Sequence, residues 1–273
     1  MPERTPSAAP AQTAITVTGC TPGIAAKSTR PAAAAPPSVA ISAISFAESG
    51  QRSDVALTAW ALLGLRAARV TADDSYVRAH EADLHGANEL ALGVLAEPHP
   101  SASLVQRLEQ APAGGAINAR AWKLIALAQA SRPLPSGDVR FLRAHHSRSG
   151  GWSWGVGVAP DSNDTAAVVE ALRAAGVTGR PIDRGLAFLR RLQNRDGGFE
   201  LVAGRGSDAQ STAWAIQAFL AARRQPGARA YRYLGSLRRT DGSYRYSTRY
   251  GATPVWVTAQ VLPALVRRFF PLR

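Results

Sequence analysis

Two carboxylates and an amide stand together in the segment Asp161-Ser162-Asn163-Asp164, just before an apolar helical stretch. A positioned carboxyl group can act as a general acid or base, or it can contact a polar ligand. Asp and Asn are also favoured helix N-caps, because their oxygens accept the free N–H groups of the first turn. Asp208 holds the equivalent place before the next apolar helix, which favours capping. Three roles stay open: capping, ligand contact by Asn163, and acid chemistry by Asp161 or Asp164.

Zinc chemistry has little support in this sequence. A zinc site needs several Cys, His or carboxylate ligands at suitable spacing. The only cysteine is Cys20, and the pair His145-His146 has no ligand partners nearby in the sequence. We therefore expect no metal and no cofactor, and we interpret His145 and His146 as surface and helix-end residues.

Three tryptophans share one position in similar apolar segments. Trp60, Trp122 and Trp214 each follow an alanine near the start of such a segment. If these segments are equivalent helices of a ring, the three indoles point in similar directions. Aromatic walls suit a lipophilic ligand and can stabilise a cation, whereas the simpler alternative is packing between helices. We name Trp60, Trp122, Trp214 and Asn163 as the candidate ligand-binding residues.

A repeated pattern predicts the elements that carry these residues. Its best copy runs from Phe188-Leu189 through Gln193 and the Gly197-Gly198 pair to Phe199, and weaker copies begin at Phe141 and Tyr233. The three copies begin 47 and 45 residues apart. Fixed periods of about 20–50 residues are typical of repeated supersecondary units.

Each repeat contains two kinds of helix. The stretch 182–192 is amphipathic and predicts an outer helix, with similar outer helices expected at 75–84, 102–110, 138–147 and 227–239. Other segments are apolar on nearly every side, which is typical of buried helices. These predicted inner helices cover 58–65, 88–95, 120–127, 165–172, 212–219 and 258–265. Alternating outer and inner helices, six of them inner, predict an all-α double ring.

A Thr-Ala pair also recurs in the inner helices, as in Thr165-Ala166, Thr212-Ala213 and Thr258-Ala259. This Thr-Ala core and the repeated pattern resemble the prenyltransferase and squalene-cyclase repeat. The resemblance covers roughly residues 55–270 and is most specific at Phe188–Phe199. It implies the (α/α)6 toroid of terpenoid cyclases and protein prenyltransferases. His146 and Arg238 replace the glutamine of the pattern, and Phe199 and Tyr244 replace its tryptophan. Fold alone does not fix function in such families.

The same resemblance bears on chemistry. The segment 161–166 is similar to the Asp-x-Asp-Asp-Thr-Ala motif of squalene-hopene-type cyclases, whose middle aspartate protonates an alkene. Here Asn163 stands at that position, and a neutral amide cannot deliver such a proton. Asp161 and Asp164 match the flanking carboxylates. The zinc-bound thiolate of the protein prenyltransferases has no counterpart, because Cys20 lies outside the repeats.

Composition divides the chain into two parts. Residues 1–50 are rich in Ala, Pro, Ser and Thr and show no helical or strand period, so we expect a disordered tail followed by one repeat domain over 51–273. Only 38–49 could supply the outer helix before the first inner helix. The first hairpin is therefore incomplete, or the natural start of the protein differs.

The chain carries a formal net charge of +13, almost wholly from arginine. Residues 181–273 alone hold 16 Arg against 5 Asp or Glu. An anionic partner such as a diphosphate or a lipid surface explains this excess, as does a solvated outer layer of helices. No nucleic-acid-binding motif accompanies the charge, so nucleic acid is not the expected partner. We expect a monomer.

No apolar stretch approaches the roughly 20 residues of a membrane span. No convincing signal peptide is present either, which favours the cytoplasm, although a different start would permit export. Two hypotheses for function remain. In the first, the chain is a non-catalytic toroid that binds a lipophilic, isoprenoid-like ligand or a protein partner. In the second, it is a terpenoid cyclase or a prenyltransferase acting on isoprenoid substrates.

Overall fold

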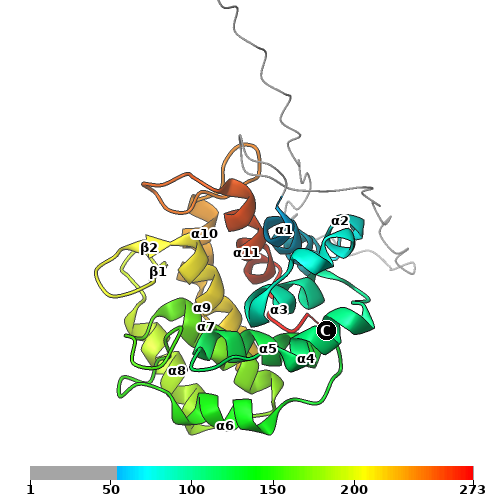
Figure 1. The fold of residues 1–273 in the computed structure, drawn as a ribbon. Helices are drawn as coiled ribbons and strands as arrows, with labels where there is room; N and C mark the ends of the chain where they lie inside the picture. Colours follow the sequence, from blue (N-terminus) through cyan, green and yellow to red (C-terminus); the bar gives the residue numbers. More distant parts are fainter. Residues whose placement is uncertain (1–53, 273) are drawn as a thin grey trace, which may run out of the picture.

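Six apolar helices form a closed inner ring in the computed structural model, which describes residues 54–272 (Figure 1). Each of these helices contacts the next one in the chain, and the last contacts the first. They are α1 (Val55–Ala67), α3 (Gly86–Ala96), α5 (Ile117–Gln129), α7 (Ser162–Ala174), α9 (Ala209–Ala221) and α11 (Pro254–Leu265). The predicted all-α toroid with six inner helices is confirmed. The predicted tail over 1–50 and its boundary lie outside the described residues.

A second set of helices returns the chain between consecutive inner helices and forms the outer layer. Within 54–272 these are α2 (Ser75–Ala79), α4 (Ala102–Gln110), α6 (Ser136–Ala144), α8 (Arg180–Arg191) and α10 (Ala228–Ser236). The outer helix expected at 75–84 is shorter than predicted, because α2 ends at Ala79 and a 3₁₀ turn, η1 (Glu81–Asp83), follows. The position at 38–49, where a sixth outer helix was considered, is not described.

The outer helices bury one face each, as their amphipathic patterns predict. In α8, Ile182, Leu186 and Leu189 are buried while Arg190 and Arg191 are exposed. The inner helices are instead buried on nearly every side: α9, for example, has eleven of its thirteen residues buried. This difference follows from position, since an inner helix touches two inner neighbours and the outer layer.

The glycine pairs of the repeat couple one repeat to the next. A Cβ on Gly151 would lie 2.7 Å from the ring of Phe188, and a Cβ on Gly198 would lie 2.7 Å from the ring of Tyr233. The aromatic that opens each repeat therefore packs on the glycine that closes the previous one. Gly197 also needs its positive φ of 94° to turn the chain after α8.

The aromatic that follows each glycine turn is locked by a threonine of the next inner helix. The backbone N–H of Trp152 donates to Thr165 Oγ1 at 2.9 Å, and that of Phe199 donates to Thr212 Oγ1 at 2.8 Å. Tyr244 repeats this bond with Thr258. The Thr-Ala core seen in the sequence is thus the anchor for each turn. After Phe199, a two-residue pair of strands, β1 (Phe199–Glu200) and β2 (Ser207–Asp208), leads into α9.

Because an outer helix returns the chain each time, all six inner helices begin at the same end of the ring. We call that end the mouth, the opposite end the floor, and the space that the ring encloses the lumen. The loops before α7, α9 and α11 each contact the start of the preceding inner helix. The N–H of Asn118 donates to the carbonyl of Trp154, that of Ser162 to Leu201, and that of Ala209 to Tyr246.

Candidate functional site at the mouth and lumen of the ring

Asp161 caps α7, which is the first of the three roles considered for the segment 161–164. Its Oδ1 accepts the backbone N–H of Asp164 at 2.9 Å. Asp208 does the same for Ser211 at the start of α9, at 2.7 Å, and Asp54 does so for Leu57 at the start of α1. The parallel drawn from the sequence therefore holds in the structure. Each of these three carboxylates thereby pairs with a backbone N–H group that the first turn of its helix leaves free.

Asp164, in the first turn of α7, is a buried carboxyl group of the mouth. The side-chain amide of Asn118 donates to its Oδ1, and Asn88 donates to Asn118 Oδ1 in turn at 2.9 Å. Burial, together with the neighbouring Asp161, raises the pKa of Asp164 to about 8, against the opposing bond from Asn118. Asp164 is therefore protonated at neutral pH, and it holds its proton more firmly than an ordinary carboxyl group does.

Amide side chains recur one turn above the aromatic layer. They lie in the first turns of four consecutive inner helices: Asn88, Asn118, Asn163 and Gln210. Asn163 is partly exposed there, and its Oδ1 accepts the hydroxyl of Ser162 at 3.2 Å. We call these four residues the amide belt. Of these four, only Asn163 is predicted from the sequence; the recurrence of an amide near the start of consecutive inner helices was the signal for the others.

Trp60, Trp122 and Trp214 converge in the lumen, one turn below the amide belt. Their ring centroids lie 5.5 Å apart for Trp60 and Trp122, 5.4 Å for Trp122 and Trp214, and 6.2 Å for Trp60 and Trp214. The interplanar angles are 85–87°, so each ring meets the others edge to face. The shared register therefore brings the three indoles together.

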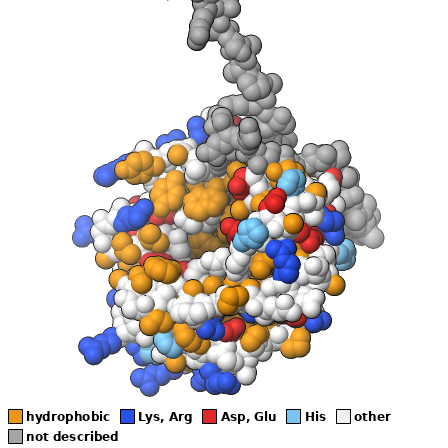
Figure 2. All heavy atoms as spheres, in the orientation of Figure 1, with side chains coloured by type: hydrophobic (Ala, Val, Ile, Leu, Met, Phe, Trp, Pro, Cys, Tyr) orange, Lys and Arg blue, Asp and Glu red, His pale blue; other side chains and the backbone are white. Residues whose placement is uncertain are grey.

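The indoles differ in their access to solvent. Trp122 and Trp214 are buried, while Trp60 keeps partial exposure. Figure 2 shows a hollow in the molecular surface, with hydrophobic side chains around it and inside it. The partly exposed indole of Trp60 is the part of the aromatic layer that an apolar ligand could contact.

Gln260, which was not predicted from the sequence, completes the aromatic layer. Its Oε1 accepts the indole N–H of Trp214 at 2.9 Å and the amide of Gln210 at 3.0 Å. Its Nε2 is buried without a hydrogen-bond partner. Gln260 follows Thr258-Ala259, so it occupies the place that tryptophan holds in three other inner helices.

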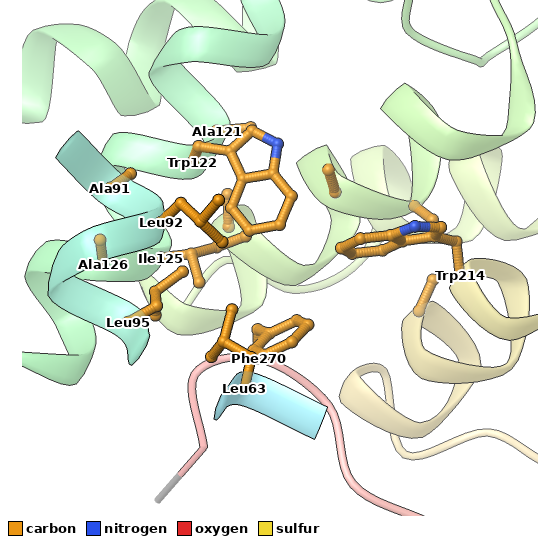
Figure 3. Packing of buried hydrophobic residues seen from close by; sticks show 14 of the residues in the cluster. Leu63, Ala91, Leu92, Leu95, Ala121, Trp122, Ile125, Ala126, Trp214 and Phe270 are labelled. Carbon is orange, nitrogen blue, oxygen red and sulfur yellow. The ribbon is translucent and has the colours of Figure 1, made fainter. Parts of the chain in front are cut away.

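The chain after α11 fills the floor of the lumen, which the sequence also did not predict. The ring of Phe270 lies 5.9 Å from that of Trp214 and 6.2 Å from that of Trp122, among the buried side chains of the inner helices (Figure 3). The backbone N–H of Phe270 donates to Glu170 Oε2 at 2.7 Å, and that of Leu272 donates to Gln129 Oε1 at 3.0 Å. Complete burial raises the pKa of Glu170 well above its ordinary value, despite the bond from Phe270.

The remaining predicted polar residues have structural roles. His145 follows α6 directly and stacks on Phe141, and His146 lies edge-on to Trp152. Within 54–272, no group of three or more His, Cys, Asp or Glu side chains could hold a metal ion. No helix in the described part of the chain is both long and apolar enough to cross a bilayer.

Several arginines also serve the fold. Arg66 donates to the carbonyls of Leu95 and Glu97 at the end of α3, and Arg173 donates to the carbonyl of Ala221 at the end of α9. These bonds satisfy carbonyls that a helix terminus leaves without partners. Part of the arginine excess is therefore explained without an anionic ligand.

Comparison with known proteins gives a fold and no close relative. No protein-family model matches the chain, and no curated protein matches its sequence. An ent-copalyl diphosphate synthase from Streptomyces platensis matches in structure with a TM-score of 0.58 and 18% identity. The match covers 78% of this chain and 50% of that enzyme. The fold is that of the terpenoid cyclases.

A second match agrees with this assignment. A protein from Actinoplanes aligns with a TM-score of 0.53 and 17% identity, over 78% of this chain and 90% of its own. The toroid described here spans about half the length of the copalyl diphosphate synthase. At identities this low the likeness establishes the fold alone.

Proposed function

We propose that this chain is a divergent prenyltransferase/squalene-cyclase-repeat toroid that binds a lipophilic, isoprenoid-like ligand at its mouth and does not catalyse its conversion. The observation that carries the proposal is Trp60, which remains partly exposed in an aromatic layer beneath the amide belt. Apolar walls with a few polar groups at one end are typical of sites for such ligands. Asn163 and Gln210 are the belt residues placed to contact a hydroxyl or other polar end.

The state of the mouth carboxyls supports a role without catalysis. Protonation of an alkene requires a strong acid in a dry site. Asp161 is engaged as the cap of α7, and a pKa of about 8 makes Asp164 a weak acid. The amide of Asn163 stands where the resembled motif has its acid.

Binding is tested with farnesol, geranylgeraniol and squalene as probes. Native mass spectrometry of the purified chain is expected to detect a co-purified lipid, and intrinsic fluorescence is expected to change saturably on titration with at least one probe. Trp60→Ala is expected to weaken that binding at least tenfold, whereas Trp154→Ala, on an exposed loop, is not. If no probe binds saturably and no lipid co-purifies, the binding proposal is wrong.

A second candidate function rests on Asp164, which holds a proton at neutral pH inside the ring. In a class II cyclase-like activity, this carboxyl group would replace the missing acid. Gas chromatography of extracts after incubation with squalene or a prenyl diphosphate separates the two candidates. Cyclic product from the wild type that is lost in Asp164→Asn or Asp161→Asn would establish an enzyme.

The matched gain-of-function variant is Asn163→Asp, which restores a carboxyl group at the motif position. We expect at most trace cyclic product from this variant, with the fold retained. A strong acid also needs donors that stabilise its conjugate base, and an added carboxylate beside Asp161 and Asp164 instead raises its pKa. Circular dichroism of the variant provides the control for folding.

A further inference from the structure

Exposed apolar side chains are concentrated at the mouth of the ring. Six large hydrophobic residues are exposed within 54–272, and five of them lie on three loops that precede α7, α9 and α11. They are Trp154, Val156, Val158, Val202 and Tyr250; the sixth, Val266, follows α11 at the floor. We call the loop tips 153–160, 201–206 and 245–252 the collar. Single exposed hydrophobic residues are common, but a concentration of them at one end of a molecule is typical of an interaction surface.

The collar is also basic. Its three tips contain Arg205, Arg245 and Arg249 and no Asp or Glu. None of these arginines takes part in the ion pairs found among residues 54–272. On the face drawn in Figure 2, hydrophobic and Lys or Arg side chains lie side by side over the loop that precedes α11.

A hollow of about 230 Å³ lies within this part of the collar. Arg239, Arg245 and Arg249 line it, together with Ser247 and Tyr250. A tight turn shapes it, because Ser247 Oγ accepts the backbone N–H groups of Arg249 and Tyr250 at 3.2 and 3.1 Å. The neighbouring acid, Asp241, accepts the N–H and hydroxyl of Ser243; these bonds, and to a lesser extent the charge of Arg239, lower the pKa of Asp241. Three guanidinium groups around one hollow are suited to a phosphate group.

We propose that the collar docks on an anionic lipid bilayer, with a phosphodiester headgroup in the hollow between Arg239, Arg245 and Arg249. The aromatic and apolar tips stand on three separate loops, and a flat surface can contact three such tips together. Trp and Tyr favour the interface between headgroups and acyl chains, while arginines nearby attract anionic lipids. The docking does not depend on the ligand proposed for the lumen.

The test is sedimentation of the full chain with vesicles of phosphatidylcholine alone or mixed with phosphatidylglycerol in equal parts. We expect binding to the mixed vesicles that weakens as salt is added, and little binding to phosphatidylcholine alone. Arg245→Gln combined with Arg249→Gln is expected to reduce binding roughly tenfold or more. The matched control, Arg143→Gln with Arg180→Gln on α6 and α8, changes the charge equally and is expected to have a much smaller effect.

Contact of the apolar tips is tested with brominated phosphatidylcholine in the mixed vesicles. Bromine quenches nearby indoles, and we expect Trp154→Phe to remove most of that quenching while Val266→Ala leaves it intact. Failure of the mixed vesicles to bind, or binding equally reduced by both arginine pairs, would overturn the proposal. Binding of inorganic phosphate and of diphosphate is measured as the alternative. Saturable binding of either one, without vesicle binding, would assign the hollow to a free phosphate instead.

Discussion

At the scale of single residues, two carboxyl groups at the mouth of the ring have different roles although they are only three residues apart. Asp161 caps the start of α7, whereas Asp164 is buried beside it. The amide of Asn118 stabilises the carboxylate form of Asp164, but burial and the nearby Asp161 outweigh it. Asp164 therefore presents a protonated carboxyl group beside the amide of Asn118 at neutral pH.

Asp164→Asn should change the pH dependence of stability. Between the ordinary pKa of an unfolded aspartate and the folded value of about 8, the folded chain keeps a proton that the unfolded chain has released. The stabilising effect of this group is therefore lost as pH rises through that window. We expect the variant to gain about 1–3 kcal/mol over the wild type between about pH 5 and pH 8.

Urea unfolding at several pH values measures this difference, with Asp183→Asn, at an exposed site on α8, as control. Burial also raises the pKa of Glu97 to about 8. Its effect on the pH dependence of stability is the same in both proteins, so it cancels when they are compared. A difference between wild type and Asp164→Asn that does not change with pH would contradict the assignment.

At the scale of elements, the two helix types and the meeting of the three tryptophans followed from the sequence. These features could be predicted because the hydrophobic period and the position of each tryptophan depend only on the sequence of the segment itself. The partners of Glu170 and Gln129 could not be predicted in this way. Glu170 binds Phe270, 100 residues further along the chain, and the segment after α11 has no repeat that would place it in the lumen. A lone glutamate in an apolar helix was the one available signal.

Trp152→Ala should destabilise the repeat that it closes. This side chain is almost fully buried and donates its indole N–H to the carbonyl of Leu142 at 2.7 Å. We expect a loss of about 3–5 kcal/mol in the free energy of unfolding. Trp154→Ala, two residues away and 60% exposed, should cost less than about 0.5 kcal/mol. Denaturant titration followed by circular dichroism compares the two, and similar losses would refute the assigned roles.

Phe270→Ala tests the segment that fills the floor. Phe270 is 1% exposed and contacts two tryptophans of the lumen, so its truncation should cost about 3–5 kcal/mol. The adjacent Phe269 is only partly buried, and Phe269→Ala should cost clearly less. Thermal unfolding of both variants is the measurement. Equal midpoints would mean that Phe270 does not occupy the lumen in solution.

At the scale of the whole molecule, closure of the ring depends on a close approach between α1 and α11. A Cβ on Gly64 would lie 2.9 Å from the backbone oxygen of Ala259, so even alanine has to separate these helices. We expect Gly64→Ala to lose about 1–3 kcal/mol of unfolding free energy, as overpacking does. Gly137→Ala in α6 meets no atom within 4 Å and should be neutral or slightly stabilising.

Equilibrium unfolding in urea compares these two glycine variants. Because the inner helices form a single closed circuit, the loss in Gly64→Ala should appear in one cooperative transition. A separate early transition in that variant would show that the α1–α11 contact opens independently of the rest of the ring.

The same contact has a consequence during synthesis. Nearly 190 residues separate the end of α1 from the start of α11, so α1 leaves the ribosome long before the helix that covers its open side. At about 5–20 residues per second, that interval lasts roughly 10–40 s. Throughout it, an apolar helix lacks one of its two inner neighbours while later repeats assemble. A nascent chain halted before Pro254 is therefore where we expect the greatest need for a chaperone.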